Sequence, residues 1–236
     1  MHIRHEAPDP VWLHTDRLVI GQSLESTNDT LFDVPLVSDL LARPAMVRYG
    51  TLPGPLSLNP NAHVDPPMVQ LQRLSAKYGI APMADVNAWQ KAVVRAVITD
   101  ESRRQGISPA LPLSVAFHES GMKMWSDVRK GTVMRNDNLR NGSLSSSDFG
   151  VMQVNNRAHA KQFPLLGQDM EANIRYGVTL LARIDRNYGQ DLGLGLGRWD
   201  ATYVVYGLGH VPQTASEWKW ARSIAGQFKK ILPQVS

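Results

Sequence analysis

Residues 108–121 read SPALPLSVAFHESG, an apolar run between a helix-starting pair and a helix-ending glycine. Ser108 can cap the first turn and Pro109 suits the first helical position, where a missing N–H costs nothing. Gly121 is a natural stop, because glycine readily adopts the left-handed conformation that ends a helix. We therefore expect a buried helix whose last turn carries Glu119.

Glu119 is the residue of this helix whose side chain can take part in acid–base chemistry. A carboxylate that closes an apolar helix is costly unless it is paired, neutral or facing a cleft. Burial disfavours the charged form and raises the pKa of a carboxyl group, which suits a general acid near neutral pH. The alternative is that Glu119 lies on the solvent side of the helix with its charge in water. The position in the helix is compatible with both.

A second segment of interest is residues 145–155, SSSDFGVMQVN. Gly150 permits a close backbone approach or a positive φ. Gln153 and Asn155 alternate with apolar residues, so both can face one cleft and hydrogen-bond a polar ligand. The alternative for this segment is a structural turn without a ligand.

The rest of the C-terminal part is mostly helical in pattern. Apolar residues at three- and four-residue spacings predict a helix from Asn87 to Ile98, with Asp85 or Asn87 as its N-cap. A polar connector is expected at 100–106, and a long loop or small hairpin wing at 125–147. Residues 192–197 (LGLGLG) are expected to be a linker, since they lack the context of a phosphate-binding loop. Three more helices are predicted at Asp169–Tyr188, Asp200–Leu208 and Ser216–Leu232.

The N-terminal part has a different character. Residues 1–85 hold ten of the fifteen prolines, and proline fixes φ and removes a backbone donor. We expect extended, turn-rich structure there. The predicted division is therefore an extended arm or accessory segment at 1–80 and a helical domain at 81–236.

Composition excludes several classes of protein. The chain has no cysteine, which removes disulfides, thiolate metal sites and cysteine nucleophiles. The formal charge of +4 suits an anionic polymer or simply a soluble surface. Basic and aromatic residues do not cluster on one element, so a nucleic-acid partner is not expected. No apolar run approaches the length of a transmembrane span.

Four segments in order resemble the soluble lytic transglycosylase (SLT) family. Residues 117–121 (FHESG) look like the family's helix ending in Glu-Ser-Gly. Residues 150–153 (GVMQ) are similar to its Gly-Leu-Met-Gln motif, with Val for Leu. Asn173 matches the Asn of the third motif, and residues 199–209 resemble the last, which places the family tyrosine at Tyr206. Together they cover about residues 104–212.

The resemblance implies a mainly α, lysozyme-like fold and cleavage of the MurNAc–GlcNAc β-1,4 bond of peptidoglycan. It makes Glu119 the catalytic acid. No cofactor or metal is implied, and 118–122 (HESGM) lacks the second His of an HExxH zinc site. The residues expected to position substrate are Ser120, Gly150, Met152, Gln153, Asn155, Asn173, Tyr203 and Tyr206.

Three features depart from the family pattern. About 28 residues separate Gly121 from Gly150, a longer stretch than usual, so the 122–147 segment is expected to line or cover a cleft. Gly207 stands where the family usually has Asn, and Tyr203 competes with Tyr206 for the tyrosine role. Residues 1–80 match nothing in the family.

Asp148 bears on the type of reaction. Residues 147–155 (SDFGVMQVN) also resemble a stretch of animal-type lysozymes, in which the aspartate is the second carboxylate, and of secretion-system transglycosylases. A lytic transglycosylase needs one carboxyl group, because the sugar's own 6-hydroxyl attacks. Asp148 is expected to stabilise the transition state, to orient substrate, or only to cap a turn.

Two further interpretations stay open beside the transglycosylase. One is a hydrolytic muramidase that uses Glu119 and Asp148 with water. The other is a non-catalytic, glycan-binding or structural component of a phage particle or secretion apparatus. The expected partner is a glycan strand, with virion or secretion proteins contacting residues 1–80. The N-terminus lacks a signal-peptide layout, so we expect action in the periplasm or cell wall after delivery by a phage particle, holin or secretion machine, or after leader removal.

Overall fold

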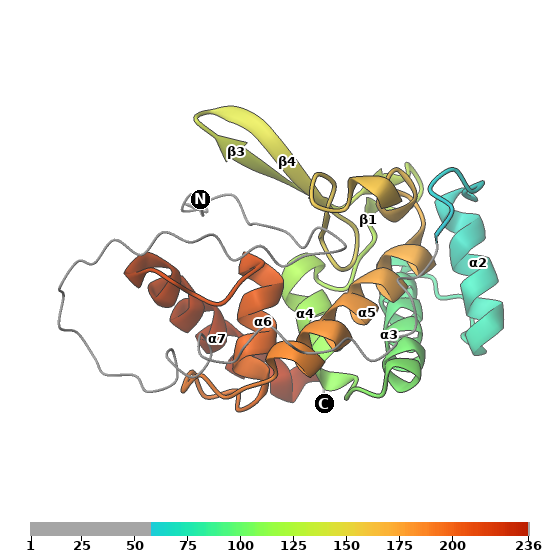
Figure 1. Cartoon of the computed structure of the whole chain (residues 1–236). Coiled ribbons are helices and arrows are strands. Elements are labelled where there is room, and N and C mark those ends of the chain that lie inside the picture. Colours follow the sequence, from blue (N-terminus) through green and yellow to red (C-terminus); the bar gives the residue numbers. More distant parts are fainter. Residues whose placement is uncertain (1–57, 236) are drawn as a thin grey trace, which may run out of the picture. The chain divides into compact units, whose positions relative to one another are not determined.

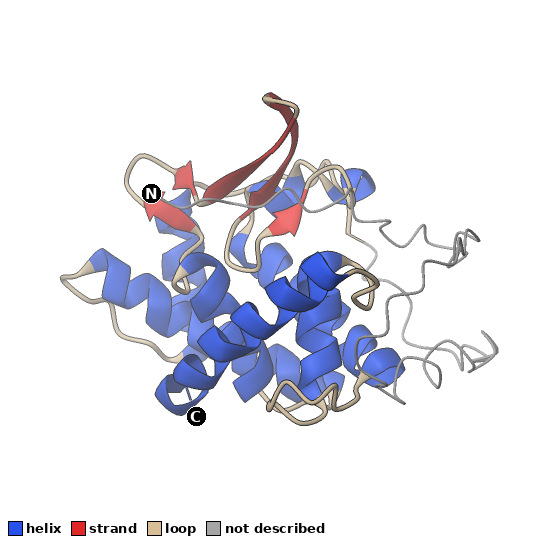
Figure 2. Ribbon diagram, turned by 90° about the vertical axis from the view of Figure 1, so that its left-hand side faces the viewer, coloured by secondary structure: helices blue, strands red, loops and turns tan. Residues whose placement is uncertain are grey.

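The part of the chain that the computed structural model describes, residues 58–235, folds mainly as α-helix and belongs to one compact unit. Its short strands lie together on one side of the helices (Figures 1 and 2). The helices are α2 (Pro67–Tyr78), α3 (Val86–Gln105), α4 (Ala110–Ser120), α5 (Met170–Tyr188), α6 (Trp199–Leu208) and α7 (Ala215–Val235). The strands are β1 (Trp125–Asp127), β2 (Thr132–Val133), β3 (Arg135–Arg140), β4 (Ser143–Phe149) and β5 (Val154–Asn155). The prediction of a mainly helical class is confirmed.

Helix α4 is the apolar helix expected from residues 108–121. Six consecutive residues, 111–116, are buried. Gly121 ends the helix with a φ of 63°, and its N–H bonds the Phe117 carbonyl at 3.0 Å. The N–H of Met122 bonds the Ala116 carbonyl, which completes a typical glycine-terminated end. The predicted stop at Gly121 is therefore confirmed.

Helix α3 is longer than the sequence pattern indicated. Its N-cap is Asp85, whose carboxylate accepts the N–H groups of Asn87 and Ala88 at 2.8 and 3.2 Å. The prediction of a polar connector at 100–106 is wrong, because the helix continues to Gln105 and ends at Gly106, which has a φ of 68°. The polar side chains of this stretch form contacts within the protein. Glu101 is 3% exposed and forms an ion pair with Arg175 of α5, with 3.1 Å between its Oε2 and the arginine Nε.

Helix α2 corrects the predicted domain boundary at residue 80. Leu71 and Leu74 are fully buried in the same core as α3 and α5. The buried Gln70 amide donates to the Gln168 carbonyl and accepts the N–H of Met170, which fastens α2 to the start of α5. Two prolines open the helix, where they are tolerated. Residues 67–78 thus belong to the helical unit, while residues 1–57 lie outside the described part.

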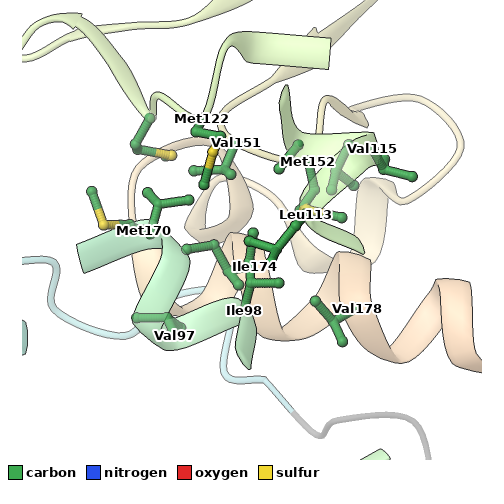
Figure 3. Packing of buried hydrophobic residues seen from close by; sticks show 14 of the residues in the cluster. Val97, Ile98, Leu113, Val115, Met122, Val151, Met152, Met170, Ile174 and Val178 are labelled. Atoms are coloured by element: carbon green, nitrogen blue, oxygen red, sulfur yellow. The ribbon is translucent and has the colours of Figure 1, made fainter. Parts of the chain in front are cut away.

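The core lies where α3, α4 and α5 meet the segments around residues 122 and 151. Figure 3 shows apolar side chains from all five segments directed toward one another. Those labelled are buried in one cluster: Val97, Ile98, Leu113, Val115, Met122, Val151, Met152, Met170, Ile174 and Val178. This packing fixes the C-terminal end of α4 against the 150–152 turn.

The segment between α4 and α5 contains the predicted wing. Strands β3, β4 and β5 form an antiparallel sheet in that order, and β1 pairs with β2 separately. The β3–β4 hairpin extends away from the helices (Figure 1). Of the two structures expected at 125–147, the hairpin is the one observed.

The glycine-rich loop 192–197 surrounds a carboxylate of the protein itself. Asp200, at the start of α6, is fully buried and accepts the N–H groups of Leu192, Leu194 and Leu196 at 3.1, 2.7 and 2.8 Å. The loop therefore connects α5 and α6 by wrapping the buried carboxyl group of Asp200. Separately, none of the helices within residues 58–235 combines the length and the apolar character needed to cross a bilayer.

Candidate functional site

Gly150 begins the turn on which the site depends. Its φ is 75°, and a Cβ there would lie 2.7 Å from both the Asn173 Nδ2 and the Met124 Sδ. No side chain fits at such distances, so the position requires glycine for both its conformation and its space. The close approach expected at Gly150 is made by Asn173 and not by a ligand.

Asn173 holds this turn through every polar atom of its amide. Its Oδ1 accepts the N–H of Met152 at 3.0 Å, and its Nδ2 donates to the carbonyls of Phe149 and Leu166 at 3.0 and 2.8 Å. The side chain is fully buried. The structure thus gives Asn173 a positioning role, and the direct substrate contact expected from sequence does not fit its burial.

Met152 and Tyr206 connect the turn to two other helices. The Met152 side chain is fully buried against Gly177 of α5. A Cβ added at Gly177 would lie 2.5 Å from the Cβ of Met152. This burial also corrects the expected substrate contact of Met152. Its carbonyl accepts the hydroxyl of Tyr206 on α6 at 2.7 Å.

Ser120 ties the end of α4 to the same turn. Its Oγ lies 2.9 Å from the Val151 carbonyl and 3.0 Å from the Ala116 carbonyl, and accepts the N–H of Lys123. The residue is 4% exposed, so its hydroxyl works within the protein. We call Ser120, Gly150, Met152, Asn173 and Tyr206 the site frame.

Glu119 is held at the junction that this frame creates. It precedes Ser120 on the last turn of α4 and is half-buried. Burial raises the pKa of Tyr203 and of Tyr206 well above the ordinary value, and the negative charge of Glu119 is the next cause for both. The charge of Glu119 therefore acts on both phenols.

His118 supports the helix end rather than titrating at the site. Its ring packs edge-on against Tyr203 and Phe228, with centroid distances of 6.0 and 6.1 Å. Burial lowers the pKa of His118, so the ring is neutral at neutral pH. The ring of Tyr203 packs at a tilt against Phe228 of α7, with centroids 3.6 Å apart, and Tyr203 is buried in the core.

Asp148 is anchored at two points by amide groups. Its Oδ1 accepts the Nδ2 of Asn155 at 2.8 Å, and its Oδ2 accepts the Nδ2 of Asn138 at 2.9 Å. Asn155 faces it from β5, and Asn138 reaches it from β3. Hydrogen bonds to a carboxylate favour its charged form. The charge of Asp148 also contributes to the raised pKa of Tyr206, after burial and the charge of Glu119.

Gln153 and Asn155 brace the hairpin against the frame. Gln153, with a φ of 47°, donates to the Gly150 carbonyl at 2.8 Å and accepts the amide of Asn136. Asn155 also donates to the Ser146 hydroxyl at 2.9 Å. Both residues are less than 9% exposed, so most of their surface contacts other parts of the protein.

Sequence reasoning missed Asn136 and Asn138. They are two residues apart on β3, so they share one face of the hairpin with their cross-strand partners Asp148 and Ser146. The signal available in the sequence was this alternation of Asn on one side of a turn and Ser and Asp on the other. It becomes readable only once the register is known.

The arrangement brings Glu119, Asp148 and two tyrosines together from α4, β4 and α6. One carboxyl group is half-buried at an apolar helix end, and the other accepts hydrogen bonds from two amides. Within residues 58–235, no three His, Asp or Glu side chains are grouped so as to hold a metal ion. Comparisons with protein-family models, with curated proteins and with solved structures return no match.

Proposed function

We propose that this protein is a peptidoglycan lytic transglycosylase with a lysozyme-like catalytic unit. The observation that carries the proposal is Glu119, a half-buried carboxyl group at the end of an apolar helix, fastened through Ser120 to the GVMQ turn. The order of the four motifs resembling the SLT family supports the same conclusion. The substrate is the MurNAc–GlcNAc β-1,4 bond of a glycan strand.

Glu119 acts first as an acid and then as a base. Its proton goes to the glycosidic oxygen as the bond from that oxygen to the MurNAc anomeric carbon breaks. The resulting carboxylate takes the proton of the MurNAc 6-hydroxyl, whose oxygen bonds the anomeric carbon and closes a 1,6-anhydro ring. The neutral form of Glu119 donates the proton, and the carboxylate left behind is the base of the second step.

Asp148 supplies fixed negative charge in this scheme. An oxocarbenium-like transition state is positive, and a carboxylate held by Asn138 and Asn155 does not need to reorganise as that charge develops. Both oxygens already accept an amide hydrogen bond, which favours an electrostatic role over attack by Asp148 as a nucleophile.

The second candidate is a hydrolytic muramidase with the same two residues. The anchored Asp148 is the specific observation in its favour, because a glycosidase that uses water needs a second carboxylate. In that case Asp148 orients a water or stabilises the transition state, and the product carries a reducing end.

Products from purified peptidoglycan separate the two candidates. The digests compare wild type, Glu119→Gln and Glu217→Gln, and mass spectrometry identifies the ends. Glu217 is a buried glutamate that caps α7 by accepting the N–H groups of Gln213 and Thr214, so its substitution is a matched chemical change away from the site. We expect 1,6-anhydro ends from wild type and Glu217→Gln, and none from Glu119→Gln.

Other outcomes reassign the protein. Reducing ends that vanish in Glu119→Gln identify a muramidase, and Asp148→Asn is then the next variant. A folded wild type that releases no product from a substrate digested by a control lysozyme points to a glycan-binding or structural role. The proposed place of action is the periplasm or cell wall, and contacts of the N-terminal segment with virion or secretion proteins are part of the same proposal.

A further inference from the structure

The turn that follows β5, residues 155–159, is organised by the first of its residues, and we call it the Asn155 turn. The Oδ1 of Asn155 accepts the N–H groups of Arg157 and Ala158, both at 3.0 Å. Its backbone carbonyl accepts the N–H of His159 at 3.1 Å. One residue therefore closes the turn through both its side chain and its backbone.

Asn155 also links this turn to Asp148. Its Nδ2 donates to the Oδ1 of Asp148 at 2.8 Å and to the Ser146 hydroxyl at 2.9 Å. The Nδ2 and the Oδ1 of Asn155 belong to one planar amide group, so a turn that fixes the oxygen fixes the nitrogen as well. A shift of the Asn155 turn would therefore move a hydrogen-bond donor of Asp148.

The far end of the Asn155 turn is attached to helix α5. The hydroxyl of Tyr176 and the Nδ1 of His159 are 2.8 Å apart and share a hydrogen bond. The two rings also pack edge to face, with centroids 5.2 Å apart. Burial lowers the pKa of His159 to about 4 and raises the pKa of Tyr176, so both groups are neutral at neutral pH. The contact is a hydrogen bond between uncharged groups.

Helix α5 thus supports two segments of the candidate site. Asn173, three residues before Tyr176, fastens the 149–152 turn, to which Ser120 ties the end of α4. Tyr176 fastens the Asn155 turn. Because residues three apart on a helix lie on one face, one side of α5 holds both turns.

We propose that Tyr176 is a positioning residue for Asp148. It acts through two intermediates, His159 and Asn155. The inference rests on the proposed function, since it gives Tyr176 a part in the same reaction. Tyr176 does not touch the glycan in this scheme. A carboxylate that is kept in place needs little reorganisation as positive charge develops on the sugar.

Two tyrosine variants test this role in the reaction. Tyr176→Phe removes the hydroxyl and keeps the ring that packs against His159. Tyr78→Phe is the matched control, because Tyr78 is also half-buried and its hydroxyl donates to Asp100 of α3 at 3.0 Å. With soluble peptidoglycan fragments, we expect kcat of Tyr176→Phe to fall about fivefold and its KM to stay within about twofold of wild type. Tyr78→Phe should keep both values.

A double variant tests whether Tyr176 acts through His159. His159→Phe should lower kcat at least as much as Tyr176→Phe. The double variant should lose no more than His159→Phe alone, because the second substitution removes a contact that is already lost. Losses that multiply, together with a raised KM, would mean that Tyr176 contacts the sugar directly, and would overturn the proposal.

Hydrogen exchange gives a readout that does not depend on activity. The backbone N–H of His159 and the side-chain amide of Asn155 form the hydrogen bonds that close the turn and hold Asp148. NMR should show both groups exchanging about tenfold faster in Tyr176→Phe than in wild type or Tyr78→Phe. Unchanged exchange in Tyr176→Phe, or an equal increase in Tyr78→Phe, would overturn the proposal.

The two readouts separate failure of this inference from failure of the proposed function. A wild type that releases no product refutes the transglycosylase, and the exchange rates then decide whether Tyr176 positions the Asn155 turn. An active wild type whose kcat is unchanged by Tyr176→Phe refutes the positioning role and leaves the proposed function intact.

Discussion

The site frame and the tip of the β3–β4 hairpin, residues 138–145, are connected through β4, which leads into Gly150, but they are built in opposite ways. In the frame, buried side chains such as Asn173 form hydrogen bonds with the backbone of the 149–152 turn. In the hairpin tip, Leu139 and Leu144 face solvent and touch little of the protein. The difference teaches that changes in the frame act through folding, whereas changes at the two exposed leucines should leave the free energy of unfolding nearly unchanged.

The largest expected effect is at Asn173. Replacement by Ala leaves three buried backbone groups without partners, which should lower the free energy of unfolding by about 4 kcal/mol. Asn187 lies on the same helix and is exposed, so Asn187→Ala should change stability by less than about 0.5 kcal/mol. Urea unfolding of both variants measures the difference. Equal stabilities would mean that the frame does not depend on Asn173.

A methyl group at Gly150 tests the same frame sterically. Gly150→Ala places a Cβ 2.7 Å from Asn173 and Met124, so we expect a loss of about 3 kcal/mol. Gly226→Ala on α7 is the control, because nothing lies within 4 Å of its added Cβ. It should stabilise the protein by about 0.5 kcal/mol. Thermal and urea unfolding give both values, and a tolerated Ala at 150 would contradict the described packing.

His159 couples the loop after β5 to helix α5 and should make stability depend on pH. Its ring meets the Tyr176 hydroxyl at 2.8 Å, and burial lowers its pKa from 6.5 to about 4. Between these values the unfolded chain binds the proton more readily than the folded one, so stability falls as pH falls from about 6.5 to about 4. The loss attributable to His159 should approach about 2 to 3 kcal/mol.

Unfolding free energies of wild type and His159→Phe at several pH values isolate this effect. The variant lacks the titrating group, so its stability should fall less across the same interval. Parallel pH profiles for the two proteins would show that His159 is not buried as described.

The smallest expected effect on stability is at Asn138, where the hairpin reaches the site. Asn138→Ala removes one of two anchors of Asp148 and should destabilise the partly buried network by about 1 kcal/mol. Under the proposed function it should lower the cleavage rate about tenfold, because the Asp148 carboxylate is then held by one amide and is less rigidly positioned. Ser143→Ala in the same hairpin is exposed and should match wild type in rate. Equal rates for both variants would separate the hairpin from the chemistry.

Local signals in the sequence were sufficient for the helices that carry the site. Helix α4 ends at Gly121 as predicted, but it begins at Ala110 with Pro109 as its N-cap and no side-chain cap, so the predicted cap at Ser108 and first helical residue at Pro109 are each one residue early. Asp85 and Asp169 cap α3 and α5. Helix α2 was missed because the surrounding prolines dominate its composition. Residues 100–105 were misread as a connector because the polar Glu101 looks solvated until Arg175 is placed beside it.

The site was less predictable, because sequence reveals a polar side chain but not the partner that uses it. The motifs that indicate the candidate site include Ser120, Met152 and Asn173. Each of these residues forms hydrogen bonds within the frame. Asn138 lies outside every motif and reaches Asp148 only through the register of β3 and β4. The motifs indicate the candidate site, and the hydrogen bonds distinguish the residues that build its frame from Glu119, the proposed acid.

The most direct test of the central claim is digestion of peptidoglycan in water enriched in oxygen-18. The account predicts muropeptides with 1,6-anhydro ends and no incorporated label, since the 6-hydroxyl attacks in place of water. It also predicts that Glu119→Gln, folded and as stable as Glu217→Gln or more so, yields none. Labelled reducing ends would contradict the transglycosylase reaction, and unchanged products from Glu119→Gln would contradict the role of Glu119.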